Sequence, residues 1–281
     1  MTYKAFLADK SRPCSIVAHR GVWRDAPENS LLAIERAVEA GYDVVEIDVR
    51  RTLDGDLVLL HDESLERTVG VAGRPEDMKS AQLTTLPLRN RDGGQDNLFT
   101  AQKLPRLADV FALCRDRIFI HLDIKDRGVI AEALALAQEF SVEQQVDFWA
   151  DLKTEDDVRW VEETILPHNI AFIARTRLEQ ASGPQQLELM FGLKPDVCEL
   201  SFTTLDQVTA LRDRFAAADI ALWVNTLDSV ASPGFTDSAA LIDPDAVWGR
   251  LLNAGFSTIQ TDEMAALQRF LATRKTGLHS Q

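Results

Sequence analysis

The sequence has few cysteines and no excess of basic residues. Cys14, Cys114 and Cys198 are an odd number without C-x-x-C spacing, and each has apolar neighbours on at least one side. We interpret them as small buried hydrophobic residues in a reducing compartment, which excludes a disulfide framework. The net charge of −14 and the pI near 4.8 argue against nucleic acid or an anionic membrane as a partner, because both require a basic face.

Long hydrophobic runs and internal repeats are also missing. No uninterrupted stretch of about 18 apolar residues occurs, and residues 1–10 lack a long apolar core. We therefore expect a soluble, cytoplasmic protein without stable membrane insertion. No repeat at the sequence level is evident. His168 and His279 are interpreted as surface residues.

Residues 42–50 form an unusual strand, because two carboxylates interrupt an apolar pattern. Glu46 and Asp48 share one face with Val44, and apolar residues occupy the other face. A strand that is apolar on both faces is typical of a parallel sheet covered by helices. Two ionised groups in such an interior need a compensating positive charge, and a divalent cation with oxygen ligands supplies it. The alternative is an edge strand with two solvated acids.

The rest of the chain alternates short apolar runs with helical patterns. This alternation favours a TIM (β/α)8 barrel over a doubly wound sheet, in a single domain over residues 1–281. Residues 63–103 break the pattern with glycines and prolines, and we interpret them as a small rim insertion with little core of its own, after the strand ending at His61. Nine runs are strand-like, of which eight could close a barrel and one could belong to a rim hairpin: 15–18, 42–50, 57–60, 118–125, 145–149, 171–174, 197–200, 220–224 and 257–260. Helices are predicted over 31–38, 107–113, 129–140, 155–165, 184–191, 205–217, 246–253 and from the last strand to about 274.

Charged and titratable residues follow the first four strands. In a TIM barrel the chemistry lies at the C-terminal ends of the strands, so these side chains are candidate site residues. Taken singly, each has a structural explanation, such as a loop histidine or an Asp-x-Lys ion pair. The set comprises His19 and Arg20 after the first strand, Glu46 and Asp48 on the second, His61 after the third, and Asp123 with Lys125 on the fourth.

Several short motifs follow one another along the chain: Ala18-His19-Arg20-Gly21, Pro27-Glu28-Asn29-Ser30, Val45-Glu46-Ile47-Asp48-Val49, Leu53-Asp54-Gly55, the stretch from Leu60-His61-Asp62 to Thr68, Leu104-Pro105-Arg106-Leu107, Leu122-Asp123-Ile124-Lys125, Trp223-Val224-Asn225-Thr226 and Gln260-Thr261-Asp262. In order and spacing they resemble the glycerophosphodiester phosphodiesterase family. The specific ones lie in the first 125 residues, and the resemblance spans nearly the whole chain. It implies a TIM barrel with a small insertion that binds one divalent metal ion, Mg²⁺ or Ca²⁺, and hydrolyses a phosphodiester to an alcohol and a phosphomonoester.

The resemblance also implies roles for individual residues. His19 and His61 match the acid/base pair, which agrees with the need for two groups that titrate near neutrality. The metal ligands would be Glu46, Asp48 and Asp123, and the phosphate-binding groups Arg20 and Lys125, whose positive charges suit a phosphoryl group that gains negative charge.

Three positions on this pattern need separate comment. Asp123 stands where the family commonly has glutamate, which shortens this ligand by one methylene. His121 lies on the same face, and we interpret it as a hydrogen-bonded core residue. Trp223 could line the substrate pocket or pack inside the barrel.

Other functions remain open from the sequence. Lys125 could form a Schiff base in a barrel lyase. A sugar-phosphodiesterase or a phospholipase D-like enzyme would differ only in the leaving group, and a barrel that only binds a phosphate ligand is the non-catalytic alternative. The alcohol headgroup, the choice between attack by water and a cyclic-phosphate route, and the oligomeric state are not decided.

Overall fold

The computed structural model describes residues 1–12 and 14–277, so His279 lies outside the described residues. The chain divides into two compact units. The N-terminal unit is Ala18–Phe148, and the C-terminal unit combines Met1–Val17 with the chain from Trp149 onward. The boundary passes through two strands, β1 (Ser15–His19) and β7 (Val146–Asp151). That the whole chain forms one domain stays a prediction.

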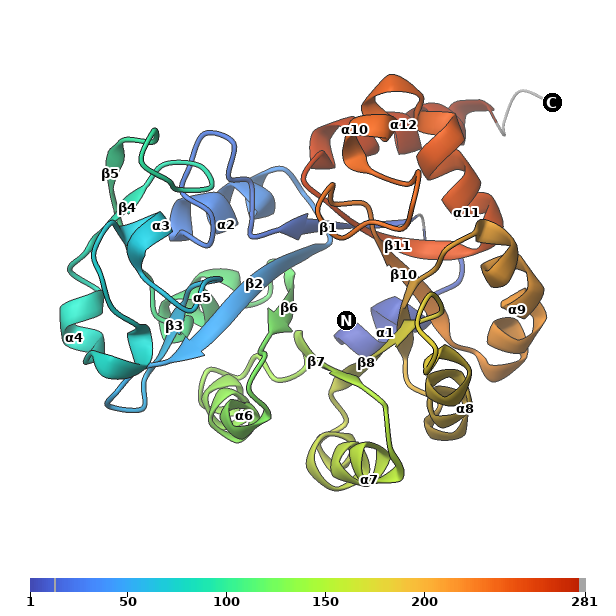
Figure 1. The fold of residues 1–281 in the computed structure, drawn as a ribbon, viewed down its shortest axis with the longest axis horizontal. Helices are drawn as coiled ribbons and strands as arrows, with labels where there is room; N and C mark the ends of the chain where they lie inside the picture. Colours follow the sequence, from blue (N-terminus) through green and yellow to red (C-terminus); the bar gives the residue numbers. More distant parts are fainter. Residues whose placement is uncertain (13, 278–281) are drawn as a thin grey trace. The chain divides into compact units, whose positions relative to one another are not determined.

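Parallel strand pairs form the centre of the N-terminal unit (Figure 1). The strand β2 (Val44–Arg51) pairs in parallel with β6 (Phe119–Asp123), which pairs in parallel with β7. The apolar residues of β2 on both faces are buried, as expected for a sheet covered on both sides. Ser30 caps the first of three helices by accepting a hydrogen bond from the Ala33 amide at 3.1 Å. The helices are α2 (Leu31–Glu39), α5 (Leu107–Cys114) and α6 (Ile130–Glu139).

The strand before His61 is not a barrel strand. β3 (Leu57–Leu59) runs antiparallel to β2, with Val49 opposite Leu59 and Arg51 opposite Leu57. It is therefore the hairpin strand among the nine predicted runs, and His61 does not follow the end of a parallel strand. The hairpin turn returns the chain along β2, so that the Leu60 amide donates to the Asp48 carbonyl at 3.1 Å. This return brings His61 beside the acidic residues.

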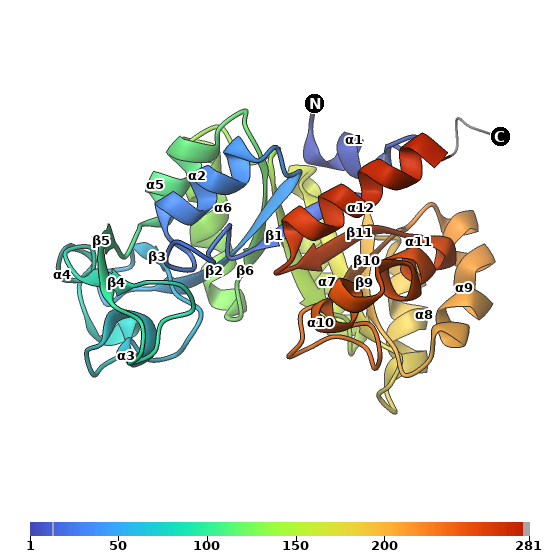
Figure 2. The same ribbon diagram turned by 90° about the horizontal axis from the view of Figure 1, so that it is seen from above.

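The insertion forms a small folded layer over the hairpin (Figure 2). The prediction that it has little core of its own is wrong, because Leu65, Val69, Leu83 and Leu88 are buried in one cluster that also includes Val58 of β3. The insertion therefore has apolar residues of its own that pack against β3. Its elements are α3 (Glu66–Val69), a 3-10 turn at Pro75–Asp77, α4 (Ser80–Leu83), and an antiparallel pair of β4 (Pro87–Arg89) and β5 (Phe99–Lys103).

The C-terminal unit continues the alternation of strands and helices. In the sheet, β8 pairs in parallel with β9, β9 with β10, and β10 with β11. The helices α1 and α10 were not predicted from the sequence. The strands are β8 (Ala171–Arg177), β9 (Val197–Ser201), β10 (Ala221–Asn225) and β11 (Phe256–Thr261), and the helices are α1 (Tyr3–Ala8), α7 (Glu155–Thr164), α8 (Gly183–Leu193), α9 (Leu205–Ala218), α10 (Asp237–Ile242), α11 (Arg250–Ala254) and α12 (Met264–Gly277). A 3-10 turn at Leu166–His168 precedes β8, and a π-helical turn at Asp245–Gly249 precedes α11.

The hydrogen-bonded strand order confirms the predicted fold class. The order is β1-β11-β10-β9-β8-β7-β6-β2, and β1 also pairs with β2. A sheet of eight strands whose first strand pairs with both neighbours is the topology of a (β/α)8 barrel.

Cys114 and Cys198 are fully buried, as interpreted from their apolar neighbours, whereas Cys14 is only partly buried.

A buried acid in the C-terminal unit predicts a pH-dependent stability. Asp237 accepts hydrogen bonds from the Thr226 and Thr261 hydroxyls, both at 2.6 Å, and burial raises its pKa to about 6. The folded state therefore binds the Asp237 proton more tightly than the unfolded chain does. The contribution of this proton to the free energy of unfolding is fully present below about pH 4 and is lost as the pH rises through 6. The shift from 3.8 to about 6 corresponds to at most about 3 kcal/mol.

Urea unfolding of the wild type and of Asp237→Asn at pH 4.5 and pH 7 measures this contribution. The unfolding free energy of the wild type, relative to that of Asp237→Asn, should decrease from pH 4.5 to pH 7. A difference between the two proteins that does not change with pH would contradict the assignment. The comparison with the variant removes the contributions of the other acids, which are common to both proteins.

Candidate functional site

Three acids of the N-terminal unit meet where the middle of β2 pairs with the C-terminal end of β6. Asp48 of β2 lies in register with Asp123 of β6. Ligand oxygens of Glu46, Asp48 and Asp123 lie within 4.8 Å of one another. Glu46 and Asp48 are each only 2% exposed, and Asp123 is half-buried. The edge-strand alternative with solvated acids is therefore wrong, and the two acids on one strand point into the protein.

The electrostatics of this triad call for a positive charge. Burial and the nearby Asp48 raise the pKa of Glu46, His19 and Arg20 partly offset both effects, and the resulting pKa is about 7. Asp48 behaves differently: burial opposes its ionisation, but Arg20, His61 and Lys125 hold its pKa below the ordinary value. One carboxylate is thus already compensated, whereas the other is held in a site that disfavours its charge.

The residues present fit a divalent cation. The donor set consists of carboxylate oxygens, which Mg²⁺ and Ca²⁺ prefer. Oδ1 of Asp123 is buried and accepts no hydrogen bond from any residue within 1–12 and 14–277. A buried carboxylate oxygen without a donor is unfavourable unless a cation satisfies it.

The first loop of the unit surrounds the acids with donors. The Arg20 amide donates to Glu46 Oε2 at 2.9 Å, and Asn29 Nδ2 donates to Asp48 Oδ2 at 2.8 Å. Both Arg20 and Asn29 adopt left-handed backbone conformations, with φ of 54° and 56°. Such strain in non-glycine residues is typical of functional sites. Gly21 is required here, because a Cβ atom would lie 2.7 Å from the backbone of Ala33.

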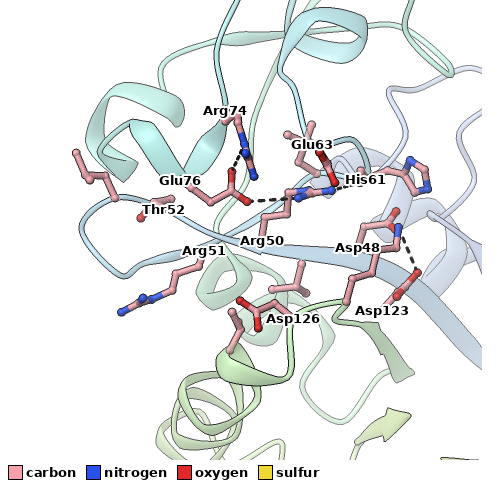
Figure 3. A pocket seen from close by; sticks show the side chains of 15 residues that line it. Asp48, Arg50, Arg51, Thr52, His61, Glu63, Arg74, Glu76, Asp123 and Asp126 are labelled. Atoms are coloured by element: carbon pink, nitrogen blue, oxygen red, sulfur yellow. Dashed lines mark hydrogen bonds and ion pairs between the residues drawn. The ribbon is translucent and has the colours of Figure 1, made fainter. Parts of the chain in front are cut away.

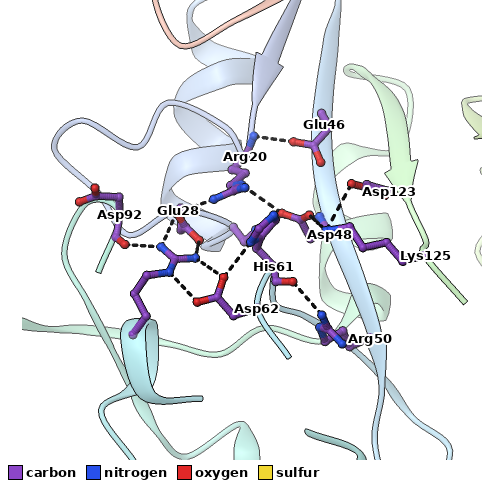
Figure 4. Close-up of polar contacts among 12 residues, drawn as sticks. Arg20, Glu28, Glu46, Asp48, Arg50, His61, Asp62, Asp92, Asp123 and Lys125 are labelled. Atoms are coloured by element: carbon purple, nitrogen blue, oxygen red, sulfur yellow. Dashed lines mark hydrogen bonds and ion pairs between the residues drawn. The ribbon is translucent and has the colours of Figure 1, made fainter. Parts of the chain in front are cut away.

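Two positively charged side chains, Arg20 and Lys125, flank the triad (Figure 4). Arg20 Nε lies 3.2 Å from Asp48 Oδ2. Lys125 follows the end of β6, and its Nζ lies 3.6 Å from Asp48 and 3.7 Å from Asp123. Its side chain is half exposed, so the ammonium group is accessible to a ligand.

Both predicted histidines belong to the N-terminal unit. His61 Nδ1 lies 2.7 Å from Asp62 Oδ1, which leaves Nε2 for a ligand, and the His61 charge acts on Asp48. Arg50 fixes the backbone of this loop by donating from Nη2 to the His61 carbonyl at 3.0 Å. His19 ends β1 and lies close enough to Glu46 for its charge to lower the pKa of that acid.

Three further residues of this site were not predicted: Glu28, Asp62 and Arg67. Glu28 is 4% exposed and accepts a hydrogen bond from Arg20 at 3.0 Å. Asp62 and Arg67 form an ion pair beside His61, with Arg67 Nε 2.6 Å from Asp62 Oδ2. All three lie inside the motifs that carry the family resemblance. The sequence contains one signal for Asp62, which directly follows His61. An acid next to a catalytic histidine can hydrogen-bond to the imidazole and fix its orientation.

A cavity of about 550 Å³ opens from the acids toward the insertion (Figure 3). On one wall, an ion-pair row runs from Arg74 through Glu76 to Arg50, with contacts of 3.5 and 3.3 Å. The cavity is large enough for a small polar molecule. It is lined by Asp48, Val49, Arg50, Arg51, Thr52, Leu53, Leu60, His61, Glu63, Arg74, Glu76, Asp123, Lys125, Asp126 and Val129.

His121 and Trp223 are both buried. His121 is buried and its Nδ1 lies 2.7 Å from Asp147 Oδ1, so it is the hydrogen-bonded core residue predicted from the sequence. Trp223 belongs to the C-terminal unit, is fully buried, and donates from Nε1 to Asn225 Oδ1 at 2.9 Å. This burial agrees with the packing alternative, and a substrate contact stays a prediction.

Comparison with known proteins identifies the family. The sequence pattern of the glycerophosphoryl diester phosphodiesterase family matches residues 19–265. The chain belongs to this family. A glycerophosphodiester phosphodiesterase of Caldanaerobacter subterraneus subsp. tengcongensis is 32% identical over 137 residues, which cover 47% of this chain and 55% of that protein. The chain spans about half the length of the curated relatives it matches.

Solved structures share the fold over most of the chain. The glycerophosphodiester phosphodiesterase from Agrobacterium tumefaciens matches with a TM-score of 0.68 and 24% identity, over 92% of this chain and 99% of that one. A phosphodiesterase from Oleispira antarctica, in complex with the product sn-glycerol-3-phosphate, matches with a TM-score of 0.65 and 21% identity. The match covers 92% of this chain and 96% of that one. Among the described residues, no helix is both long and apolar enough to span a membrane.

Proposed function

We propose that the protein is a metal-dependent phosphodiesterase that hydrolyses a small glycerophosphodiester to an alcohol and sn-glycerol 3-phosphate. One observation carries this proposal: within the N-terminal unit of a chain of this family, three acids, His61 and two cations meet beside one cavity. The product bound to the Oleispira antarctica relative supports the choice of a glycerol phosphate.

The acidic triad would hold Mg²⁺ or Ca²⁺, which supplies positive charge to the phosphoryl oxygens as negative charge grows on them. Arg20 and Lys125 add donors for the same oxygens. Because both cations already lie within 4 Å of Asp48, they are held at the acids before a substrate arrives.

His19 and His61 would exchange the protons of the reaction. One imidazole removes a proton from the entering oxygen, and the other donates a proton to the leaving alkoxide. His61 is prepared for this role, because Asp62 pairs with its Nδ1 and leaves Nε2 for the substrate. The alcohol would occupy the cavity between the acids and the insertion.

A panel of diesters tests the proposal. The protein is incubated with Mg²⁺ or Ca²⁺ and with glycerophosphodiesters that carry choline, ethanolamine, inositol or glycerol, and sn-glycerol 3-phosphate is measured with a coupled dehydrogenase. We expect its release from at least one of them. Sugar phosphodiesters and lysophospholipids are assayed in parallel by the release of their own alcohol or phosphomonoester, and turnover of these alone would favour those alternatives. Tight binding of phosphate without turnover of any diester would favour a binding protein. A cyclic phosphate in the early products would indicate attack by a substrate hydroxyl.

A further inference from the structure

Arg67 connects the insertion to the candidate site through five N–H···O contacts. Its Nε and Nη2 donate to the two oxygens of Asp62 at 2.6 and 2.9 Å. Its Nη2 and Nη1 donate to the two oxygens of Glu28 at 2.6 and 3.0 Å. A fifth contact reaches the Asp92 carbonyl. Every N–H group of the guanidinium is therefore used, and both acids are bound in the bidentate fork that only arginine provides.

Each of the two acids holds a different site residue (Figure 4). Asp62 Oδ1 lies 2.7 Å from His61 Nδ1. Glu28 Oε2 accepts a hydrogen bond from Arg20 Nη1 at 3.0 Å. Arg67 is thus one step removed from the histidine on one side and from the phosphate-binding arginine on the other. Within the described part of the chain, no other side chain hydrogen-bonds to both acids.

The ionised state of Asp62 is consistent with a fixed arrangement of Arg67, Asp62 and His61. Although burial opposes its ionisation, hydrogen bonds from Arg67 and His61 hold the pKa of Asp62 well below its usual range. Asp62 is therefore a permanent acceptor for the Nδ1–H of His61. Without Arg67, the Asp62 carboxylate would keep only the His61 imidazole as a side-chain partner among the described residues, and its plane could rotate.

We propose that Arg67 is a positioning residue that orients His61 through Asp62 and Arg20 through Glu28. The insertion, which carries Arg67 on α3, then forms part of the reaction machinery and is more than a rim. This inference rests on the proposed phosphodiesterase function. A purely structural role for Arg67 is the alternative, since the Gly94 amide also donates to the Arg67 carbonyl at 2.7 Å.

Substitution of Arg67 with a matched control separates the two roles. Arg89→Ala is the control, because Arg89 lies in the same insertion, donates to the Asn97 carbonyl at 2.9 Å and packs over Phe99. Loss of such an outer contact typically costs 10- to 100-fold in activity. We expect Arg67→Ala to lower kcat/KM by about that factor, guanidinium ion to restore part of it, and Arg67→Lys to remain impaired. Arg89→Ala should stay within about twofold of the wild type.

The two arms of the cluster have different kinetic signatures. Asp62→Asn should chiefly lower kcat, because it disturbs the proton-transfer group, and Glu28→Gln should chiefly raise KM, because it releases the phosphate-binding Arg20. In a His61→Ala background, the effect of Arg67→Ala on kcat should become smaller, since the histidine that it orients is absent.

Several results would overturn the inference. Wild-type kcat and KM in Arg67→Lys would do so, as would an unchanged effect of Arg67→Ala in the His61→Ala background. If Arg67→Ala melts below the assay temperature, the kinetics of Asp62→Asn and Glu28→Gln test the proposal instead. Wild-type kcat and KM in both of these variants would reject it. A wild type without activity on every diester rejects the proposed function instead, whereas an active wild type with equally active Arg67 variants rejects only the role of Arg67.

Discussion

His61→Ala is expected to lower kcat by about 10²- to 10⁴-fold while the protein stays folded. General acid–base catalysis by a positioned side chain contributes roughly this factor. His61 is about one-third exposed and lies in a loop, so its loss should leave no large cavity in the core. We expect the same range for His19→Ala. Initial rates with a glycerophosphodiester, at saturating substrate and metal, measure kcat directly.

His168→Ala is the matched control for the two histidine variants. His168 is exposed in the 3-10 turn before β8 and belongs to the C-terminal unit, so its removal should leave kcat unchanged. Circular dichroism and thermal melting verify that all three variants are folded. Full activity in either His19→Ala or His61→Ala would rule out the assignment of that histidine.

The fold was predictable because its strands are strongly patterned. Strands such as 44–49 are apolar on both faces, and this pattern survives in the structure as burial on both sides of β2. The antiparallel direction of β3 was not predictable, since a short apolar run carries no information about its partner strand. Helix α10 was missed because its six residues, Asp237–Ile242, are too few to show a helical period.

Site residues were predictable where the residue type itself is unusual for its position in the sequence. They were not predictable where their role depends on contacts between distant parts of the chain. Glu46 and Asp48 are conspicuous, because acids are rare in a strand that is apolar on both faces. Glu28 and Arg67 are 39 positions apart and look like ordinary surface charges in the sequence. Only the folded insertion brings them within 2.6 Å, and a single sequence does not contain that distance.

The hairpin explains why His61 reaches the acids even though the reasoning from barrel strands was wrong for it. A parallel strand would bring its last residue to the same edge as Asp48. The antiparallel return of β3 reaches the same place from the opposite direction, because the Leu60 amide binds the Asp48 carbonyl. The position of His61 therefore depends on the length of the β2 extension and its turn.

Removal of the divalent cation, or of one of its acidic ligands, is expected to abolish most of the activity. Stabilisation of the phosphoryl charge by a metal is worth several kcal/mol, and about 4 kcal/mol corresponds to about 10³-fold in rate. Treatment with a chelator should lower the rate by at least that factor, and Mg²⁺ or Ca²⁺ should restore it. Asp123→Asn should lower the rate comparably, and added metal should not rescue it. Glu139→Gln, which changes an exposed carboxyl group on α6, is the matched control.

Thermal stability gives a second measurement of the same site that does not depend on turnover. A cation at 100 times its Kd stabilises the folded protein by about 2.7 kcal/mol, which raises Tm by roughly 5 °C for a chain of this size. The wild type and Glu139→Gln should show this rise, whereas Asp123→Asn and Glu46→Gln should not. In the absence of metal at pH 8, Glu46→Gln should melt no lower than the wild type, because burial and Asp48 disfavour the charge that it removes. A protein that melts at the same temperature with and without the cation, and keeps its activity in chelator, would show that the three acids serve another purpose.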